Sequence, residues 1–271
     1  MNADPARIDP LLNLQVCGKG PDLVLLHGWG LNLRVWDRLT EALESAFRLI
    51  AVDLPGHGRS AWTEDARDPM GLIRRVHEAV SAVSTRYSLL GWSLGGQLAL
   101  QWAASRPSEV ERLILVATTP LFSARPDWPH GMAPEVMDRF STRLATDYRR
   151  TVSEFLELQV RGSAGSAAVL EALRSAVFSH GEAAAEALVA GLDTLARSDL
   201  RPLLPGISTP ALVLAGQYDR VTPPSASRAL AEALPDARYV EFRRAAHAPF
   251  LSHPDEFVRL VVEFMEGERR P

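Results

Sequence analysis

The stretch Ser88-Leu89-Leu90-Gly91-Trp92-Ser93-Leu94-Gly95-Gly96 contains the clearest pattern in the chain, a serine between glycines in the spacing Gly-x-Ser-x-Gly. The apolar run before the serine predicts a buried strand, and residues 94–104 after it have the period of a helix. A tight strand-to-helix turn accepts only small residues beside the serine. It also places the hydroxyl at the helix N-terminus, where free N–H groups favour developing negative charge. The pattern therefore predicts Ser93 as a nucleophile rather than an incidental serine in a glycine-rich turn.

A serine hydroxyl is a weak nucleophile and needs a general base. Among the seven histidines, His247 is favoured because it follows the apolar run 238–242, at the expected carboxyl edge of a sheet. Asp219 follows the run 211–216 in the same way, and its carboxylate would orient the imidazole and stabilise the imidazolium. This order of serine, aspartate and histidine differs from the orders in chymotrypsin-like and subtilisin-like proteases. We therefore predict a triad of Ser93, Asp219 and His247.

Other titratable residues have simpler interpretations. His57 is expected to build its own glycine-rich loop, His77 to be solvated on a helix, and His253 to flank a helix N-terminus. Asp53 competes with Asp219 for the role of the acid. It precedes the serine in the chain, however, and is expected to tie down its own Pro-Gly turn.

Attack on an ester carbonyl creates an oxyanion, which backbone N–H groups can stabilise. One N–H is expected from Leu94, the residue after the nucleophile, and the other from the loop His27-Gly28-Trp29-Gly30. The glycines let this loop approach the substrate, and Trp29 is the expected donor. The Trp29 indole is expected either to line the pocket or to pack in the core.

Short apolar runs alternate with helical patterns over much of the chain. The runs are residues 23–27, 49–53, 88–92, 113–117, 211–216 and 238–242. Apolar runs with little polar alternation suit strands that are buried on both faces. The alternation predicts an α/β fold with a mainly parallel central sheet and helices on both faces.

Residues 120–197 break this rhythm, because they contain helical patterns and no clear strand. The helical patterns are 134–144, 149–160, 167–178 and 182–195, and the short GSAGS segment at 162–166 is expected to be a turn. We therefore expect an α/β core formed by residues 1–119 and 198–271. Residues 120–197 are expected to form an inserted helical cap.

The composition excludes several other classes of protein. With 46% hydrophobic and 23% charged residues the chain is typical of a folded globular protein, and a net charge of −4 gives no nucleic-acid footprint. A single cysteine excludes an internal disulfide and a cysteine-based metal centre. No secretory signal is visible in the sequence, and no apolar run approaches the roughly 20 residues that span a bilayer. We expect a cytoplasmic monomer that acts without a membrane, nucleic acid, metal or cofactor.

Taken together, the motifs resemble the α/β-hydrolase superfamily over nearly the whole chain. Within it, residues 26–32 with Val35-Trp36, residues 91–96, and residues 245–250 with Ser252-His253-Pro254 are similar to the pimeloyl-[acyl-carrier protein] methyl ester carboxylesterases of biotin synthesis. The segment 150–159 also resembles the cap helix of that family. Many hydrolases share the core motifs, whereas the cap segment and the 245–254 stretch are more specific.

The resemblance implies a serine carboxylesterase that removes the methyl group from the pimeloyl ester on an acyl-carrier protein. It implies that the substrate contacts Trp29, Ser93, Leu94, Phe155, Leu156, Glu157, Leu158, Gln159 and His247. Because carrier proteins of this type are acidic, it also implies docking arginines, with Arg149, Arg150 and Arg161 as candidates. The sequence departs from the family pattern at Glu154, for which Arg149, Arg161 and Arg174 are candidates to compensate. The cap is not basic overall, because it carries eight arginines against ten acidic residues.

Several alternatives share this fold, because a fold does not determine its chemistry. They are a general esterase for small short-chain esters, an enol-lactone hydrolase and a carbon–carbon bond hydrolase. A haloalkane dehalogenase is disfavoured, because its nucleophile is an aspartate and residue 93 is serine. A non-catalytic binding protein belongs to a different class, and the complete triad argues against it.

Overall fold

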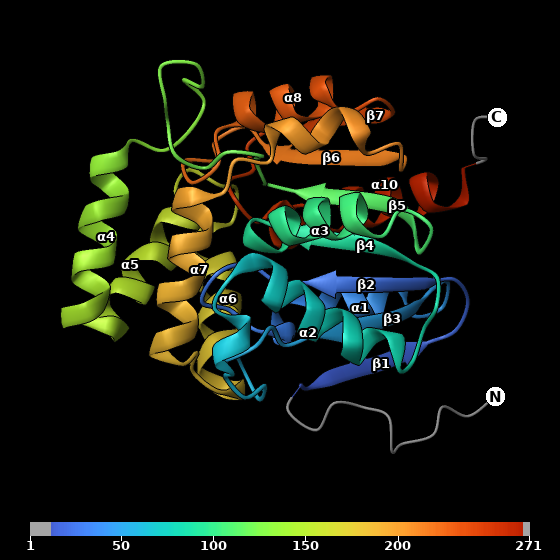
Figure 1. Ribbon diagram of the computed structural model, residues 1–271, viewed down its shortest axis with the longest axis horizontal. Coiled ribbons are helices and arrows are strands. Elements are labelled where there is room, and N and C mark those ends of the chain that lie inside the picture. The colour runs from blue at the N-terminus through green and yellow to red at the C-terminus, as the bar shows by residue number, and fades with distance from the viewer. Residues whose placement is uncertain (1–11, 268–271) are drawn as a thin grey trace.

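The computed structural model describes residues 12–267, apart from the side chains of Ala145 and Tyr148, and contains one seven-stranded sheet (Figure 1). The strands are β1 (Leu14–Gly18), β2 (Asp22–Leu26), β3 (Arg48–Val52), β4 (Tyr87–Trp92), β5 (Val110–Val116), β6 (Ala211–Gly216) and β7 (Ala237–Phe242). Their order across the sheet is β1-β3-β2-β4-β5-β6-β7. All neighbouring pairs are parallel except β1 and β3, which are antiparallel. The predicted α/β fold with a mainly parallel sheet is confirmed.

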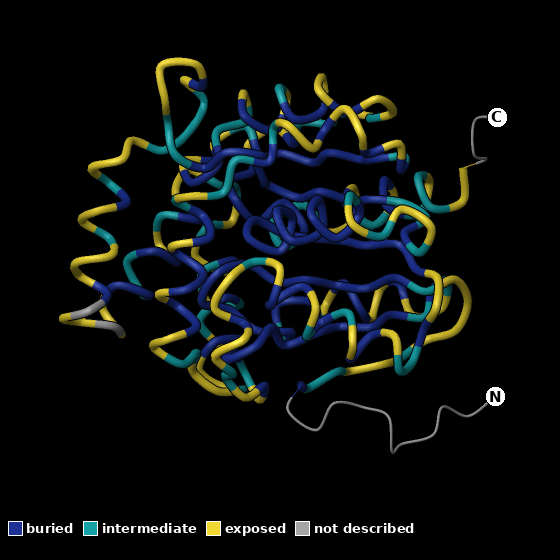
Figure 2. Tube along the Cα trace, viewed as in Figure 1, coloured by how far each residue is buried: buried dark blue, intermediate teal, exposed yellow. Residues whose placement is uncertain are grey.

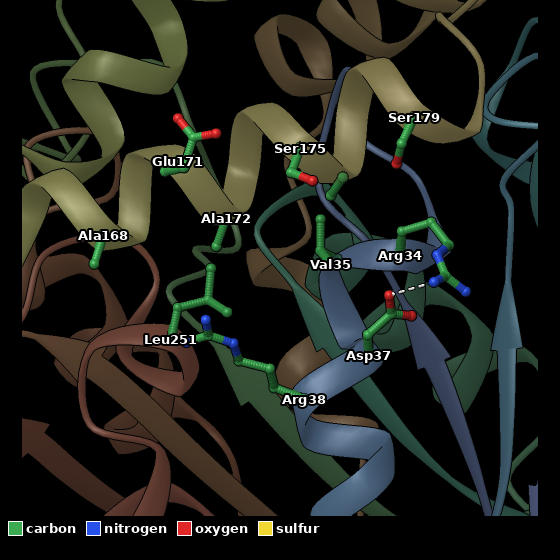
Figure 3. A pocket seen from close by; sticks show the side chains of 11 residues that line it. Arg34, Val35, Asp37, Arg38, Ala168, Glu171, Ala172, Ser175, Ser179 and Leu251 are labelled. Carbon is green, nitrogen blue, oxygen red and sulfur yellow. Dashed lines mark ion pairs between the residues drawn. The ribbon is translucent and has the colours of Figure 1, made fainter.

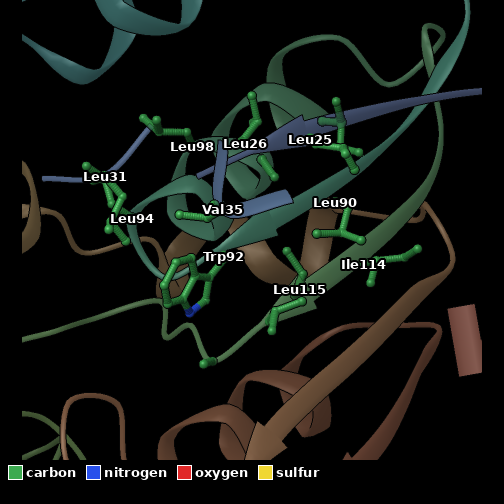
Figure 4. Close-up of a cluster of buried hydrophobic side chains, with 14 of the residues drawn as sticks. Leu25, Leu26, Leu31, Val35, Leu90, Trp92, Leu94, Leu98, Ile114 and Leu115 are labelled. Carbon is green, nitrogen blue, oxygen red and sulfur yellow. The ribbon is translucent and has the colours of Figure 1, made fainter. Parts of the chain in front are cut away.

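The central strands are buried on both faces, as their apolar runs predicted. Every residue of β4 and β6 is buried. In Figure 4, the side chains of Leu25, Leu90 and Leu115 belong to one cluster that extends from β2 across β4 to β5. Figure 2 shows the same arrangement for the whole chain, with the strands buried and most exposed segments at the periphery. This apolar layer provides the rigid platform on which the loops at the strand ends are built.

Helices cover both faces of the sheet. Outside residues 120–197 they are α1 (Asp37–Leu43), α2 (Pro69–Ser81), α3 (Leu94–Ser105), α8 (Pro224–Ala233), α9 (Pro249–Ser252) and α10 (Pro254–Glu266), with 3₁₀ turns η2 (Leu33–Trp36), η3 (Glu64–Ala66) and η4 (Arg201–Gly206). Figure 1 shows α2 and α3 in front of the sheet and α1 and α10 behind it. None of the helices in residues 12–267 is both long and apolar enough to cross a lipid bilayer.

The segment after β5 forms four helices, α4 (Pro134–Thr146), α5 (Tyr148–Val160), α6 (Ser166–His180) and α7 (Ala185–Arg197). They lie beyond the carboxyl ends of the strands, on the left of Figure 1. The chain leaves and re-enters the core at one place, where Leu121 and Asp199 form an antiparallel bridge. The four helical patterns read from the sequence correspond to these helices.

Strand β1 was not predicted from the sequence. It lies at the edge of the sheet, pairs only with β3 and is largely exposed or half-buried. An edge strand of this kind lacks the continuous apolar run that identifies a strand buried on both faces.

Candidate active site

Ser93 lies in the turn between β4 and α3, with φ +55° and ψ −115°. A positive φ is uncommon for a residue other than glycine and persists only where surrounding contacts enforce it. The Ser93 N–H donates to the Val116 carbonyl at 2.9 Å, and the Ser93 carbonyl accepts from the Thr118 hydroxyl at 2.7 Å. The strained backbone is therefore held from β5 and from the loop that follows it.

The glycines beside Ser93 are required by close backbone contacts. A Cβ atom at Gly91 would lie 2.3 Å from the Gly95 carbonyl oxygen, and one at Gly95 would lie 2.3 Å from the Leu26 carbonyl oxygen. Both distances are far shorter than a van der Waals contact, so neither position accepts a side chain without movement of the backbone. The Gly-x-Ser-x-Gly spacing is therefore explained by the packing of α3 against β2 and β4.

His247 and Asp219 form a buried pair in the loops after β7 and β6. Nδ1 of His247 lies 2.7 Å from Oδ2 of Asp219, and Oδ1 of the same carboxylate accepts the N–H groups of Val221 and Thr222 at 2.8 Å each. Because the carboxylate accepts, Nδ1 carries the proton and Nε2 presents a lone pair. Nε2 is buried and has no hydrogen-bond partner among the described residues. In a neutral ring, this is the tautomer that a general base needs.

Two backbone hydrogen bonds hold His247 in place from opposite sides. The indole N–H of Trp92, the residue before Ser93, donates to the His247 carbonyl at 2.8 Å. The His247 N–H donates to the carbonyl of Gln159 in α5 at 2.9 Å. His247, the predicted base, is thus attached both to Trp92 at the end of β4 and to helix α5.

A small apolar cavity of about 30 Å³ lies over Ser93. It is lined by Trp29, Ser93, Phe122, Met132, Val136, Met137, Phe140, Phe155, Leu158, Leu192 and Leu195. The Trp29 ring packs edge-on against Phe140 and Phe155, at centroid distances of 5.4 and 5.2 Å, and its N–H donates to the Leu188 carbonyl at 2.9 Å. The Trp29 ring has both of the roles that were expected as alternatives, because it lines the cavity and is also a buried member of the hydrophobic core.

The loop that carries Trp29 lies against the nucleophile, since a Cβ on Gly28 would be 3.5 Å from the Ser93 Cβ. Gly30, with φ +70°, adopts a conformation that favours glycine. No hydrogen bond among the described residues uses the N–H of Trp29 or Leu94. Both groups are therefore free to act as the expected oxyanion donors, a role that stays a prediction.

His27 fixes the orientation of this loop, a role that the sequence did not suggest. Its Nε2 accepts the Leu54 N–H at 3.0 Å, so Nδ1 carries the proton and donates to the Gly28 carbonyl at 2.8 Å. Burial, reinforced by the neighbouring His57, lowers the pKa of His27 to about 3 and keeps the ring neutral. Because a trans peptide is planar, a Gly28 carbonyl held by His27 forces the Trp29 N–H to point the opposite way.

The residues of the segment 155–159, which were expected to contact substrate, lie in different environments. Phe155 and Leu158 line the cavity, and the backbone carbonyl of Gln159 accepts the His247 N–H. Leu156 is buried in the core but is not among the residues that line the cavity, and the exposed Glu157 forms an ion pair with Arg174 at 2.9 Å. Substrate contact stays a prediction for these residues.

The expected docking arginines differ in their partners. Arg149 pairs with Glu182 at 2.6 Å, and Arg150 pairs with Glu154 at 2.9 Å. Arg161 is exposed and forms no ion pair within residues 12–267.

Asp53 behaves as the loop residue that the sequence predicted. Its carboxylate accepts from the Leu33 and Arg59 N–H groups and lies 2.9 Å from His180 Nε2 in the cap. Nδ1 of His57 lies 3.1 Å from the Pro55 carbonyl of the same loop, as expected.

The predicted N-terminal position of His253 before α10 is confirmed. The prediction that His77 is solvated was wrong. Its side chain is 14% exposed and lies 2.7 Å from Glu109, because α2 packs against α3, where the His77 ring lies edge-on to Trp102 at a centroid distance of 5.8 Å.

A larger hollow of about 480 Å³ lies elsewhere, between α6, η2 and α1 (Figure 3). Arg34 and Asp37 at its edge form an ion pair at 2.8 Å. None of the three predicted triad residues lines it. This larger hollow is therefore not the predicted catalytic site.

Comparison with known proteins agrees with this geometry. Residues 21–254 match the family described as the alpha/beta hydrolase fold. The pimeloyl-[acyl-carrier protein] methyl ester esterase of Nitrosomonas europaea is 43% identical over 247 residues, which cover 91% of this chain and 96% of the relative. The protein of the same name from Chromobacterium violaceum is 41% identical, covering 95% of this chain and 99% of the relative. The resemblance inferred from the motifs is confirmed.

Solved structures share the fold at lower identity. The enol-lactonase from Burkholderia xenovorans LB400 superposes with a TM-score of 0.81 at 26% identity, covering 94% of this chain and 96% of that chain. An esterase from Exiguobacterium antarcticum gives a TM-score of 0.85 at 24% identity, covering 94% of this chain and 96% of that chain, and it supports the fold alone.

Proposed function

Since the chain belongs to the α/β-hydrolase family, we propose that it is a serine carboxylesterase that hydrolyses the methyl ester of pimeloyl-acyl-carrier protein in biotin synthesis. The observation that supports the chemistry is the buried His247–Asp219 pair at 2.7 Å, whose imidazole ring lies 5.5 Å from the ring of Trp92, the residue before Ser93. The relatives named above support the choice of substrate. The cytoplasmic location and the monomeric state expected from the sequence stay predictions.

In the proposed reaction, Ser93 Oγ attacks the ester carbonyl carbon while Nε2 of His247 takes the hydroxyl proton. The N–H groups of Trp29 and Leu94 stabilise the oxyanion. His247 then gives its proton to the departing methoxide, so methanol leaves and an acyl-enzyme remains. Water attacks this acyl-enzyme with His247 again as base, and the free carboxylic acid is released. Asp219 remains ionised and stabilises the imidazolium at each stage.

The cavity lining supports a neutral, aliphatic acyl chain, because every side chain that lines it apart from Ser93 is apolar or the indole of Trp29. A neutral methyl ester end can enter such a site, whereas an apolar lining disfavours the entry of a charged carboxylate. The volume of about 30 Å³ equals roughly one water molecule. The proposed cap, residues 120–197, must therefore shift to admit a seven-carbon chain.

The test is turnover of pimeloyl-acyl-carrier-protein methyl ester, followed by mass spectrometry of the carrier protein. We expect Ser93→Ala to lower kcat by roughly 10⁴-fold or more, and Asp219→Asn to lower it strongly while the fold is retained. If Asp219→Asn keeps most activity, the acid is misassigned and Asp53 becomes the candidate.

Small p-nitrophenyl esters provide the comparison for substrate choice. We expect kcat/KM for the carrier-bound ester to exceed that for p-nitrophenyl butyrate. Turnover of the small ester alone would remove the proposed substrate and favour a general short-chain esterase.

A further inference from the structure

The peptide that joins Ser93 to Leu94 carries one of the two expected oxyanion donors, the Leu94 N–H. The carbonyl of this peptide, which belongs to Ser93, accepts three hydrogen bonds within the described residues. Two come from N–H groups in the first turn of α3, those of Gly96 at 3.0 Å and Gln97 at 3.2 Å. The third and shortest comes from the hydroxyl of Thr118, at 2.7 Å, in the loop after β5. Because the peptide is planar and trans, the groups that hold this carbonyl also set the direction of the Leu94 N–H.

The first turn of α3 lacks the usual side-chain cap. A serine at the N-cap position commonly accepts a hydrogen bond from an N–H of the first turn. Ser93, the N-cap residue of α3, makes no such bond, and in the proposed reaction its hydroxyl has to remain free. The Thr118 hydroxyl supplies a contact from outside the helix instead. Thr118 is buried, so bulk water does not compete for this bond.

The loop that carries Thr118 is itself held on three sides. The Ala117 N–H donates to the Leu214 carbonyl of β6 at 2.8 Å, and Ala117 has φ +45°, an uncommon conformation for a residue other than glycine. The hydroxyl of Ser227 in α8 donates to the Thr118 carbonyl at 2.9 Å. Nε2 of Gln97 in α3 donates to the carbonyl of the residue after Thr118 at 3.0 Å. These contacts fix the place from which the Thr118 hydroxyl donates.

Gly96, which follows the Gly-x-Ser-x-Gly pattern, is explained by the same contact. A Cβ atom at Gly96 would lie 2.6 Å from both Cβ and Cγ2 of Thr118, and 2.7 Å from its Oγ1. The serine pattern ends at Gly95 and does not itself require a glycine at the next position. Thr118 can lie against the first turn of α3 because residue 96 has no side chain.

We infer that Thr118 is a positioning residue of the oxyanion site, whose hydroxyl holds the Ser93 carbonyl and thereby orients the Leu94 N–H. The inference rests on the proposed function, because it assigns a role within the oxyanion site of that reaction. Thr118 acts through the peptide and does not touch the substrate carbonyl itself.

The other expected oxyanion donor is held in the same way. Nδ1–H of His27 donates to the Gly28 carbonyl at 2.8 Å and so sets the direction of the Trp29 N–H. Each of the two donors therefore has a buried side chain bonded to the carbonyl of its own peptide, one from the loop after β2 and one from the loop after β5.

The test uses two substitutions of Thr118 and a matched control at the next residue, all in the full chain. Thr118→Val keeps the shape of the side chain and removes the donor, whereas Thr118→Ser keeps the donor and removes a methyl group. Because the Ser93 carbonyl retains two backbone donors, the turn should stay folded in both variants. Thr119→Val is the control, since the Thr119 hydroxyl is also buried but donates to the Leu121 carbonyl, at 2.9 Å.

We expect Thr118→Val to lower kcat on p-nitrophenyl butyrate by about 10-fold, less than the roughly 10²–10³-fold loss that follows removal of an oxyanion donor. KM should change little, and Thr118→Ser should restore kcat to within about 3-fold of the wild type. Thr119→Val should keep kcat within about 2-fold at a similar midpoint of urea unfolding. The acid limb of the pH profile should not move in Thr118→Val, because within residues 12–267 neither His247 nor Asp219 is hydrogen-bonded to Thr118.

A boronic acid that adds to Ser93 tests the orientation of the donor without ester turnover. In the wild type, the tetrahedral adduct should move the amide proton resonance of Leu94 downfield, as a new hydrogen bond does. In Thr118→Val both this change and the affinity for the boronic acid should decrease.

The inference is overturned if Thr118→Val keeps the wild-type kcat and the wild-type response of the Leu94 amide. It is also overturned if Thr118→Ser loses as much kcat as Thr118→Val, or if Thr119→Val does, because the loss would then not depend on the hydroxyl bonded to Ser93. A wild-type chain that hydrolyses neither p-nitrophenyl butyrate nor the carrier-bound ester would refute the proposed function. The boronic acid titration would still decide the role of Thr118 in that case.

Discussion

His27 offers a test of how the oxyanion loop is held, because its two ring nitrogens have separate partners. Nδ1–H donates to the Gly28 carbonyl at 2.8 Å, and Nε2 accepts the Leu54 N–H at 3.0 Å. An asparagine amide nitrogen can occupy roughly the place of Nδ1, and a glutamine amide oxygen roughly that of Nε2. His27→Asn therefore keeps the hold on Gly28, whereas His27→Gln keeps the bond to Leu54 and releases Gly28.

The expected costs follow from the burial of these groups. Each variant leaves one buried backbone group with a missing partner, which costs about 1–3 kcal/mol of stability. Gly28 keeps one weaker partner, the Leu31 N–H at 3.3 Å, so the loop persists but is less constrained. Loss of one oxyanion donor costs roughly 10²–10³-fold in kcat. We expect His27→Gln to lose kcat by about 10²-fold, and His27→Asn to lose 10-fold or less at a similar stability.

The assay measures kcat and KM on p-nitrophenyl butyrate, together with the midpoint of urea unfolding for each variant. Affinity for a boronic acid that mimics the tetrahedral intermediate should fall in parallel with kcat, while KM changes little. A purely structural role for His27 predicts instead that activity follows stability in both variants. Equal kcat values for His27→Asn and His27→Gln at equal stability would refute the role in orienting the Trp29 N–H.

Two further predictions concern stability. Burial lowers the pKa of His27 to about 3 and also lowers the pKa of His57, so the unfolded chain binds protons below about pH 6.5 that the folded chain does not. Stability should therefore fall as the pH falls, by about 2 kcal/mol at pH 5 from His27 alone, and an unfolding free energy that is equal at pH 7 and pH 5 would contradict this. Gly216→Ala would place a Cβ atom 1.9 Å from the Ala246 carbonyl oxygen, next to His247. It should cost about 1–3 kcal/mol and lower kcat, whereas a variant with wild-type stability and kcat would show that this loop moves freely.

The parts of the fold that the sequence predicted are those with strong local signals. Strand β6 is buried at every residue, so its apolar run was visible, and the helices of the cap have clear periods. All five residues of strand β1, at the edge of the sheet, are half-buried or exposed, and the strand carries no such run. The triad could be proposed from the sequence because each member lies in the loop or turn after a strand, and parallel strands bring their carboxyl ends to one edge.

Features that depend on contacts between distant segments could not be predicted. Nothing near His27 in the sequence indicates that its partner is the Leu54 N–H, 27 residues away. The neutralisation of Arg149 by Glu182 requires α5 and the loop before α7 to lie side by side. The prediction for His77 failed for the same reason. The helical pattern around His77 does not show that its side chain contacts the carboxylate of Glu109, 32 residues away.

The contacts of the proposed cap, residues 120–197, indicate which of its helices we expect to move when the acyl chain enters. Helix α5 is attached to the base through the Gln159–His247 hydrogen bond, and α7 is attached to the oxyanion loop through Leu188 and the Trp29 indole. Movement of either helix would disturb the catalytic groups. Helix α4, in contrast, lies on the outside of the cap, where most of its residues are exposed (Figure 2). It contributes three apolar side chains to the cavity wall, Val136, Met137 and Phe140.

Displacement of α4 would therefore enlarge the cavity over Ser93 while His247 and Trp29 keep their positions. We expect amide hydrogen exchange in residues 134–146 to be faster than in 148–160 and 185–197, because a helix with fewer buried contacts opens more readily. Ester analogues with a long aliphatic chain, bound covalently to Ser93, should change exchange in α4 more than in α5 or α7. Equal protection of the three helices would contradict the expected displacement of α4. A ligand effect confined to α5 would also contradict it, and would indicate that the acyl chain enters by movement of the helix that contacts His247.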